Sequence, residues 1–308
     1  MHHTPVRRLF LFAVALIVTG CAALSDPISP RPAMPAVWSE AASADTVALT
    51  RDWWNGFGSS DLTTLIDAAL VANPDVVIAT ERVRQAEAQA NIAGSTLFPS
   101  LSVGAGTNRR ETLPHGGSRT GESSSSVVLS ASYELDLWGG NTAGVRAAES
   151  SLRATRFDQD AVRLTLVAGV ANSYFQLLSL RGRLVVARDN LEIAERVFKL
   201  VDTRARNGAV TQLDVARQRA AVLSLQASIP PLELQERQTL FALAILAGRQ
   251  PEGFEAAGPA VTTLAVPRVS PGLPSDLLVR RPDLASAEAQ LAAANANVTV
   301  ARAALLPN

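Results

Sequence analysis

The chain has 308 residues, of which 28 are basic, 28 acidic and 47% hydrophobic, enough apolar content for one large domain or two. Balanced charge argues against a nucleic-acid partner, which would favour a basic chain. Only three histidines occur, and His2 and His3 lie in a segment expected to be removed, so we expect no metal site, no cofactor and no histidine-based catalysis.

Residues 1–21 have the pattern of a lipoprotein signal. Arg7 and Arg8 precede Leu9–Thr19, an uncharged apolar run too short to span about 30 Å of hydrocarbon. The run ends in Val-Thr-Gly-Cys, which resembles a lipobox and makes Cys21, the only cysteine, the expected lipidation site. An ordinary secretory signal with an incidental cysteine is the alternative. Ala22, directly after the cysteine, resembles a signal for outer-membrane sorting.

Residues 22–60, which include four prolines before Ala36, predict an extended tether. Residues 61–99 predict two helices. The first opens at Asp61, and the second begins after Pro74, with Asp75 suited to the positive end of the helix dipole. We expect this second helix to run to about Gly94, before the stop at Pro99.

Residues 100–137 predict a β-hairpin. Apolar residues occupy every second position from Val127 to Leu137 and again from Leu101 to Ala105, which is the period of a strand with one apolar face. The run from Val127 to Leu137 has about the 9–11 residues that a tilted membrane strand needs. The polar stretch Asn108–Ser126 is expected to be the loop between the two runs. A soluble hairpin packed on helices fits the same pattern equally well.

Residues 138–250 predict a long helical hairpin. Helix formers fill Asn141–Asn207, and an unbroken helix there would measure about 100 Å, so it needs a long partner. Apolar residues recur at alternating steps of four and three, which implies a left-handed coiled coil. Apart from Ser173, the positions are apolar: Leu166, Val170, Ser173, Leu177, Leu180, Leu184, Ala187, Leu191, Ala194, Phe198, Val201 and Ala205.

The tip of the hairpin is expected at residues 207–211. Gly208 follows Asn207 and can end a helix in the left-handed conformation, while Thr211 and Asp214 suit the cap of the return helix. Pro230 and Pro231 are expected to kink or interrupt that helix. The face predicted to meet the first helix consists of Leu213, Ala216, Ala220, Leu223 and Ala227.

Residues 251–272 predict a loose connector, and residues 273–308 begin an internal repeat. Leu65–Pro99 aligns without a gap on Leu273–Pro307, sharing a Leu-Val-x-x-Pro-Asp start and a terminal Leu-x-Pro. A duplication of this length predicts a two-half architecture rather than a solenoid. The second copy stops at Asn308 where the first continues, so we expect the chain to be incomplete.

Three motifs carry a family resemblance: YELDLWG at Tyr133–Gly139, NGAVTQLD at Asn207–Asp214 and LPSDLLVRRPD at Leu273–Asp283. Together and in this order they resemble the outer-membrane efflux protein family, the TolC-like channels, and within it the lipidated branch typified by OprM. Gly140 and Asn141 depart from the basic residue that often follows the Trp-Gly pair.

The resemblance implies a mainly α fold: a periplasmic α-barrel of long antiparallel coiled-coil helices, with a β-hairpin that joins a trimeric outer-membrane β-barrel. It implies a homotrimer that passively conducts drugs or other solutes as the exit duct of a tripartite efflux pump. The implied partners are a periplasmic adaptor, the inner-membrane transporter indirectly, and outer-membrane lipid. It also implies adaptor docking at Gly208, Ala209, Val210 and Thr211, with Asp214 nearby. Alternatively, Gly208 and Asp214 only shape and cap the turn, and gate residues would lie beyond Asn308.

There are three alternatives to a channel subunit. A truncated member of the same family would form no pore. A periplasmic adaptor lipoprotein also has a helical hairpin, but its flanks are β-rich and here they are predicted helical. A lipid-anchored enzyme would need a nucleophile–base pair, metal-ligand spacing or a phosphate loop, and the sequence has none of these. Glu134 and Asp136 are expected to lie on the polar face of a strand, in contact with solvent, so we predict no enzymatic activity.

Overall fold

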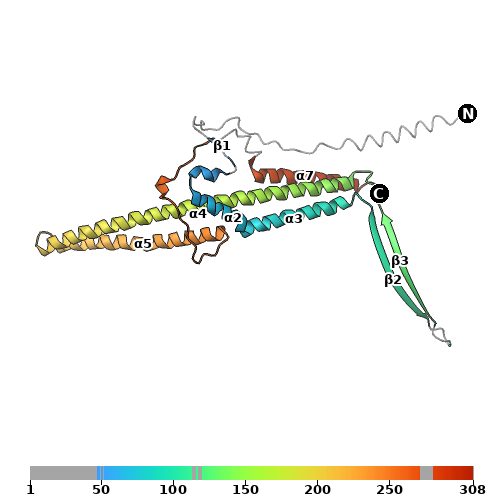
Figure 1. Ribbon diagram of the computed structural model, residues 1–308, viewed down its shortest axis with the longest axis horizontal. Helices are drawn as coiled ribbons and strands as arrows, with labels where there is room; N and C mark the ends of the chain where they lie inside the picture. The colour runs from blue at the N-terminus through green and yellow to red at the C-terminus, as the bar shows by residue number, and fades with distance from the viewer. Residues whose placement is uncertain are drawn as a thin grey trace. The chain divides into compact units, whose positions relative to one another are not determined.

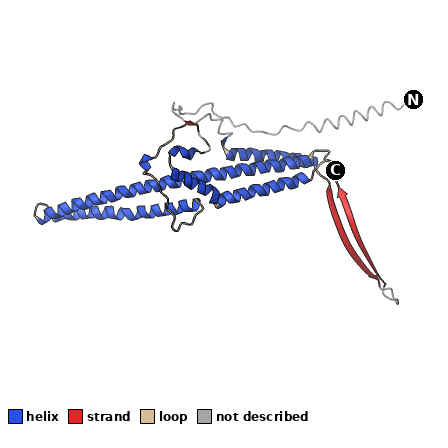
Figure 2. Cartoon of the chain, in the orientation of Figure 1, coloured by secondary structure: helices blue, strands red, loops and turns tan. Residues whose placement is uncertain are grey.

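The computed structural model describes residues 47, 48, 50, 52–112, 116, 120–270 and 280–307, all within one compact unit, Ala36–Asn308. The predicted signal, Cys21 and most of the predicted tether lie outside the described residues, as does the first part of the Leu273–Asp283 motif. The described part is mainly helical with one long strand hairpin, as expected (Figures 1 and 2).

Two consecutive helices follow the short 3-10 helix η1 (Trp53–Phe57): α2 (Ser60–Ala72) and α3 (Pro74–Ser95). Asn73 separates the two helices, and its Oδ1 accepts a hydrogen bond from the Asp75 amide at 2.8 Å. Pro74 occupies the first position of α3, where no amide hydrogen is needed. The predicted start of the second helix is therefore confirmed.

Strands β2 (Ser100–Thr112) and β3 (Thr120–Ser132) pair antiparallel over their whole length, with Ser100 opposite Ser132. They run through much of the stretch expected to be a loop, and β3 stops at Ser132 rather than Leu137, so both predicted limits are wrong. Backbone pairing requires no apolar side chain, and hydroxyl pairs such as Thr107 Oγ1 with Ser125 Oγ, 2.8 Å apart, support the polar part.

Beyond β3 the chain turns to begin α4 (Gly140–Arg206), a single helix of 67 residues. Asp136 caps this helix, because its carboxylate accepts hydrogen bonds from the backbone amides of Asn141 at 3.0 Å and Thr142 at 2.8 Å. Its predicted place on the polar face of a strand is wrong. The ladder ends at Ser132 because its partner strand β2 begins only at Ser100, directly after Pro99, which has no amide hydrogen.

The long helix α4 pairs along its second half with α5 (Gln212–Leu246). All the α4 positions predicted to face a partner are buried or half-buried, which confirms that face. The predicted α5 face is wrong, because all five of its residues are exposed. The α5 residues that are half-buried instead share the same three–four spacing: Val215, Gln218, Val222, Leu225, Ile229, Leu232 and Glu236.

Pro230 and Pro231 lie inside α5, and the helix continues through them, so the expected interruption at these prolines is wrong. Each proline removes one amide donor, a loss that a long packed helix can tolerate. Directly after them, Glu233 pairs with Arg188 at 2.7 Å and Glu236 pairs with Arg181 at 3.1 Å, both arginines lying on α4. These cross-helix contacts hold the second half of α5 against its partner.

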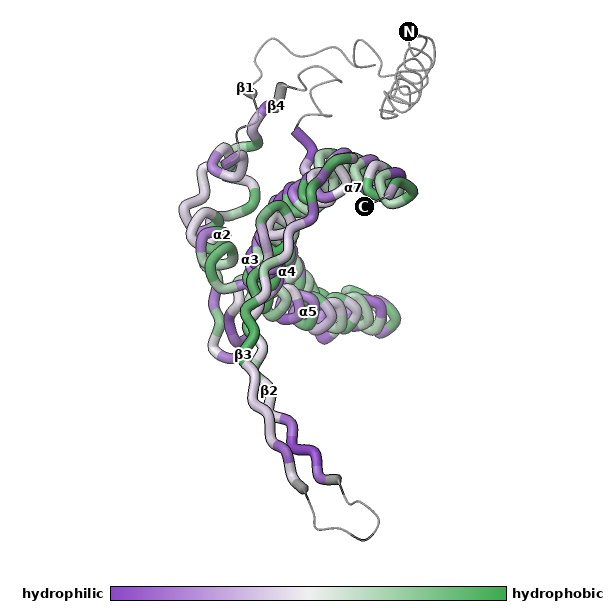
Figure 3. Tube along the Cα trace, turned by 90° about the vertical axis from the view of Figure 1, so that its right-hand side faces the viewer, coloured by the Kyte–Doolittle hydropathy of each residue, from purple (hydrophilic) through white to green (hydrophobic). Residues whose placement is uncertain are grey.

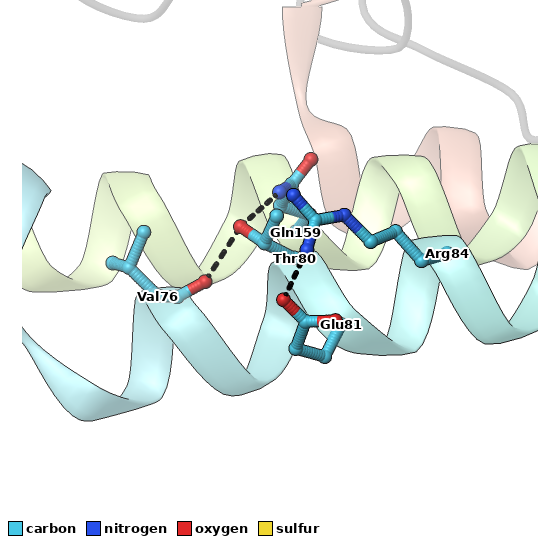
Figure 4. Close-up of polar contacts among 5 residues, drawn as sticks. All are labelled: Val76, Thr80, Glu81, Arg84 and Gln159. Carbon is cyan, nitrogen blue, oxygen red and sulfur yellow. Dashed lines mark hydrogen bonds and ion pairs between the residues drawn. The ribbon is translucent and has the colours of Figure 1, made fainter.

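The repeat is visible in α7 (Pro282–Ala303), which has 22 residues like α3 and begins and ends 208 positions after it. Both helices pack on the first half of α4 (Figure 1). On the α3 side, Gln159 Nε2 donates to Thr80 Oγ1 at 2.8 Å (Figure 4). On the α7 side, Ser286 Oγ donates to Asp158 Oδ1 at 2.6 Å. One half of α4 is thus held by repeat-related helices and the other half by α5.

The apolar core lies where α2, the middle of α4 and the end of α5 meet. Its fully buried members include Leu62, Ile66, Tyr174, Leu177 and Leu243. After α5, Phe254 and Ala256 enter this core. The chain then continues through the 3-10 helix η2 (Val261–Thr263) to β4 (Val269–Ser270), which pairs in parallel with β1 (Val47–Ala48).

Two polar contacts fasten this core. Tyr174 OH and Ser59 Oγ share a hydrogen bond of 2.9 Å, and burial raises the pKa of the phenol. Arg181 Nη1 donates to the Ala256 carbonyl at 2.6 Å, joining the connector to α4. The middle of α4 is thereby tied both to the segment before α2 and to the segment after α5.

In the described part of the chain, no helix taken singly has the length and apolarity needed to cross a bilayer. The pair α2 and α3, bent by 45° at their break, meets that test together on length and composition only.

Candidate functional sites: the helical tip and the strand hairpin

The tip of the α4–α5 hairpin is a turn built around Gly208. Its φ of 72° lies in the left-handed region that favours glycine, although an added Cβ would meet no atom within 4 Å. The Gly208 amide donates to the Ala205 carbonyl at 3.0 Å, and the Ala209 amide donates to the Arg204 carbonyl at 2.9 Å. Conformation rather than lack of space therefore selects glycine here, and these bonds satisfy the last carbonyls of α4.

Thr211 and Asp214 begin α5 with a reciprocal capping box. The Asp214 amide donates to Thr211 Oγ1 at 3.3 Å, while Asp214 Oδ2 accepts from the Thr211 hydroxyl at 2.6 Å and from its amide at 3.1 Å. These bonds favour the ionised carboxylate and lower the pKa of Asp214, the hydroxyl of Thr211 making the largest contribution.

The structure brings all five predicted docking residues together in this turn. Gly208, Ala209 and Thr211 are exposed, whereas Val210 and Asp214 are half-buried. Gly208 and Asp214 have clear structural roles in shaping and capping it, as the alternative interpretation expected. Docking of an adaptor at these residues stays a prediction.

The strand hairpin presents an exposed apolar face close to the helices. Opposed pairs such as Leu101 with Ala131 and Val103 with Leu129 share this face, and the Leu129 side chain is 72% exposed. The other face carries Ser102 opposite Ser130. Hydropathy falls along the ribbon towards its far end (Figure 3). A two-stranded ribbon exposed on both sides is marginal by itself, so this face indicates contact with further apolar material.

Helix α5 has two apolar faces, and only the outer one was predicted from the sequence, where it was assigned wrongly to the contact with α4. This outer face points away from α4 and continues the predicted stripe along the helix, and Leu223 on it is 54% exposed. The exposed large residues of this outer face are Leu213, Leu223, Leu234, Phe241 and Ile245. A helix that is apolar on two sides requires two neighbours. Because the two apolar stripes of α5 have the same spacing, the sequence pattern did not show which stripe faces α4.

The YELDLWG motif lies at the junction of the strand hairpin with the two repeats. Besides the Asp136 cap, Trp138 Nε1 donates to the Pro307 carbonyl at 2.8 Å, which joins the start of α4 to the turn that follows α7. Within the described ranges, no three histidine, cysteine or acidic side chains cluster closely enough to hold a metal ion.

A strand hairpin that leads into a long helix, flanked by repeat-related helices and returning as a coiled-coil hairpin, defines the architecture of a TolC-like channel subunit. Residues 65–249 match the family described as outer membrane efflux protein, and the chain belongs to that family. The resemblance inferred from the three motifs is confirmed, as is the fold class.

Similar proteins of the family are known from several bacteria. The pyoverdine export outer membrane protein OpmQ of Pseudomonas aeruginosa is 42% identical over 311 residues, covering 98% of this chain and 66% of OpmQ. The cation efflux system protein CusC of Escherichia coli K12 is 30% identical over 307 residues, covering 98% of this chain and 66% of CusC. The chain therefore spans just under two thirds of the length of these relatives.

Among solved structures, the outer-membrane channel OprN matches with a TM-score of 0.79 and 27% identity, over 91% of this chain and 65% of OprN. The relatives are named as outer membrane proteins, export components and channels rather than as enzymes. The location that follows for this chain is the bacterial outer membrane.

Proposed function

We propose that the chain is a subunit of a homotrimeric outer-membrane channel that passively conducts solutes out of the cell, as the exit duct of a tripartite efflux system. The observation that carries this proposal is the pair of exposed apolar faces, one on the strand hairpin and one on α5, in a chain of this family. Each face has the form expected of a different environment, lipid for the strands and neighbouring helices for α5.

The strand hairpin supplies the membrane contact in this proposal. The apolar face of β3 carries Val127, Leu129 and Ala131. The exposed apolar side chains of Tyr133, Leu135 and Leu137 follow the strand towards α4. Strand β3 itself has 13 residues, enough for the about 9–11 that a tilted membrane strand needs. Both outer edges of a single ribbon need partners, because lipid satisfies no backbone hydrogen bonds. A closed barrel removes those edges, and in this proposal each of three subunits contributes two ribbons to it, this one and one from the second repeat.

The outer face of α5 supplies the contact between helices. Its leucines follow the same seven-residue repeat as a coiled-coil seam, so a second long helix can pack along it. In a trimer that helix belongs to the surrounding wall of the tunnel. This arrangement also gives the long helix α4 its purpose, since about 100 Å is the scale of a periplasmic duct and far exceeds a domain core.

At the far end of α4 from the strands, the turn at Gly208–Thr211 is where we place docking of a periplasmic adaptor, which would link the channel indirectly to an inner-membrane transporter. Lipidation at Cys21 would add an anchor in the outer membrane. OpmQ is named for pyoverdine export and CusC for cation efflux, so cargo differs among relatives. Drugs or other solutes are the broad cargo class proposed for this chain.

A deletion strain tests both the efflux function and the docking site. Loss of the gene is expected to increase sensitivity to an exported compound, and the full-length gene is expected to restore resistance. Ala209→Asp should fail to restore it and should lose chemical crosslinking to the adaptor, because a charge is placed in the exposed turn. Ser224→Asp, also exposed but on α5, is the control and should restore both. Equal resistance and crosslinking in the two variants would place docking elsewhere.

A further inference from the structure

The charged side chains around the helical tip are unevenly distributed. Between Val197 and Leu232 the chain has five basic residues, Lys199, Arg204, Arg206, Arg217 and Arg219, against two acidic ones, Asp202 and Asp214. The segment therefore has a net charge of +3, and the rest of this neutral chain has −3. Positive charge is concentrated at one end of the helical hairpin.

Contacts within the tip neutralise little of this charge. Asp202 Oδ2 accepts a hydrogen bond from Arg206 Nη2 at 2.6 Å. The Asp214 carboxylate is occupied by the capping box, although Arg217 also favours its ionised form. The side chains of Lys199, Arg204 and Arg219 are exposed, as is that of Arg217.

Helix dipoles explain only part of the pattern. Arg204 and Arg206 lie in the last turn of α4, where basic side chains stabilise the negative end of the helix. Arg217 and Arg219 lie in the second turn of α5, near its positive end, where a cation gains nothing from the dipole. A role outside the chain accounts better for these two arginines.

From this charge distribution we infer that the tip binds an acidic protein surface, with carboxylates of the partner surrounding an apolar contact at Ala209 and Val210. The inference rests on the proposed docking function and specifies the chemistry of the adaptor. Small apolar residues, one exposed (Ala209) and one half-buried (Val210), with cations around them match the anatomy of a protein interface, which has an apolar centre and a polar rim. An anionic lipid surface fits less well, because the turn itself has no large apolar side chain to insert.

The test uses the full-length channel with a photoreactive residue in place of Val210, which reports docking without changing charge. Three channels that all carry this photoreactive residue are compared. The first has no other change, the second is R217E/R219E, and the third is the control R163E/R183E, which reverses two exposed arginines of α4 away from the tip. The probe is the purified adaptor to which position 210 crosslinks, and affinity is measured at low and high salt.

We expect R217E/R219E to weaken adaptor binding about tenfold or more at low ionic strength, and the difference to shrink in high salt, because screening weakens interactions between exposed charges. The control should bind within about twofold of the unmodified channel. Carboxylate residues of the adaptor at the crosslink are then replaced by lysine. If these replacements restore the affinity of the adaptor for R217E/R219E, they identify the acidic surface.

Three results would overturn the inference. If position 210 crosslinks to the adaptor but R217E/R219E binds like the control, docking stands and the charge complementarity is wrong. Reduced stability of the trimer with unchanged adaptor affinity would mean that the arginines pair within the channel. If anionic vesicles bind the unmodified channel and compete with the adaptor, the partner surface is lipid. Absence of any crosslink at position 210 would instead refute docking at the tip itself.

Discussion

Leu129→Arg tests which face of the strand hairpin meets lipid. Leu129 is the middle one of three apolar residues, Val127, Leu129 and Ala131, that β3 places on this face. An arginine that faces lipid near the middle of a bilayer destabilises a membrane barrel by about 2–4 kcal/mol. A trimer has three copies of the substitution, so the assembled channel would lose about 6–12 kcal/mol, comparable to the whole stability of many domains.

Ser130→Arg is the matched control. Ser130 is adjacent in sequence but lies on the opposite face of the ribbon, across from Ser102, and we propose that this face lines the water-filled interior of the barrel. The same side chain should therefore be tolerated there, with an altered conductance as its main effect. The assay is the amount of trimer in unboiled outer-membrane fractions. Equal trimer for both variants, or loss of trimer only for Ser130→Arg, would refute this assignment of the faces.

Three further predictions concern the helical part of the chain. Gly248→Ala should destabilise the fold severely, since φ is +67° and a Cβ would lie 2.6 Å from the Ala72 carbonyl. Gly253→Ala is the control, at a similar φ but in open space, and should cost only about 1 kcal/mol; thermal unfolding measures both. Ser59→Ala should cost at least about 1–3 kcal/mol, because it leaves the buried hydroxyl of Tyr174 unpaired and also removes the cap of α2, where Ser59 Oγ accepts a hydrogen bond from the Leu62 amide at 3.2 Å. Tyr174→Phe in the Ser59→Ala background should recover only the part due to the unpaired hydroxyl. The pKa of Asp214 is lowered from 3.8, so the stability that its cap contributes is present above that pH and is lost as the pH falls through the folded-state pKa. Hydrogen exchange at the tip, corrected for intrinsic rates, should show this loss, and Asp214→Asn should abolish the pH dependence.

Much of the helical architecture could be predicted because local signals and long-range packing agree. Pro74 at the first position of α3 and Pro282 at the first position of α7 mark both helix starts, and the constant offset of 208 relates them. The uninterrupted run of helix formers gave α4 its predicted length of 67 residues, within one residue at each end.

Errors arose where two arrangements satisfy the same pattern. On α5 the stripes that contain Leu223 and Val222 have the same spacing, and only the contact with α4 decides between them. Asp136 alternates with apolar neighbours as in a strand, yet its carboxylate caps a helix. Pro230 predicts a break by its local chemistry, but packing along α4 keeps the helix continuous.

The features of the candidate sites differ in whether they could be predicted from the sequence. Gly208, Thr211 and Asp214 were identifiable because a left-handed turn and a capping box have strong sequence signals. The link from Trp138 to Pro307 joins residues 169 positions apart and has no local signal. The outer face of α5 became meaningful only when the inner face was known.

Single-channel recording of the purified full-length protein in a planar bilayer asks whether the chain forms a conducting trimer. We expect a trimer on native gels and stepwise conductance without any energy source, and we expect Leu129→Arg to give neither. A protein that stays monomeric, or a stable trimer that inserts without conducting, would contradict the proposal that this chain forms the wall of an outer-membrane efflux channel.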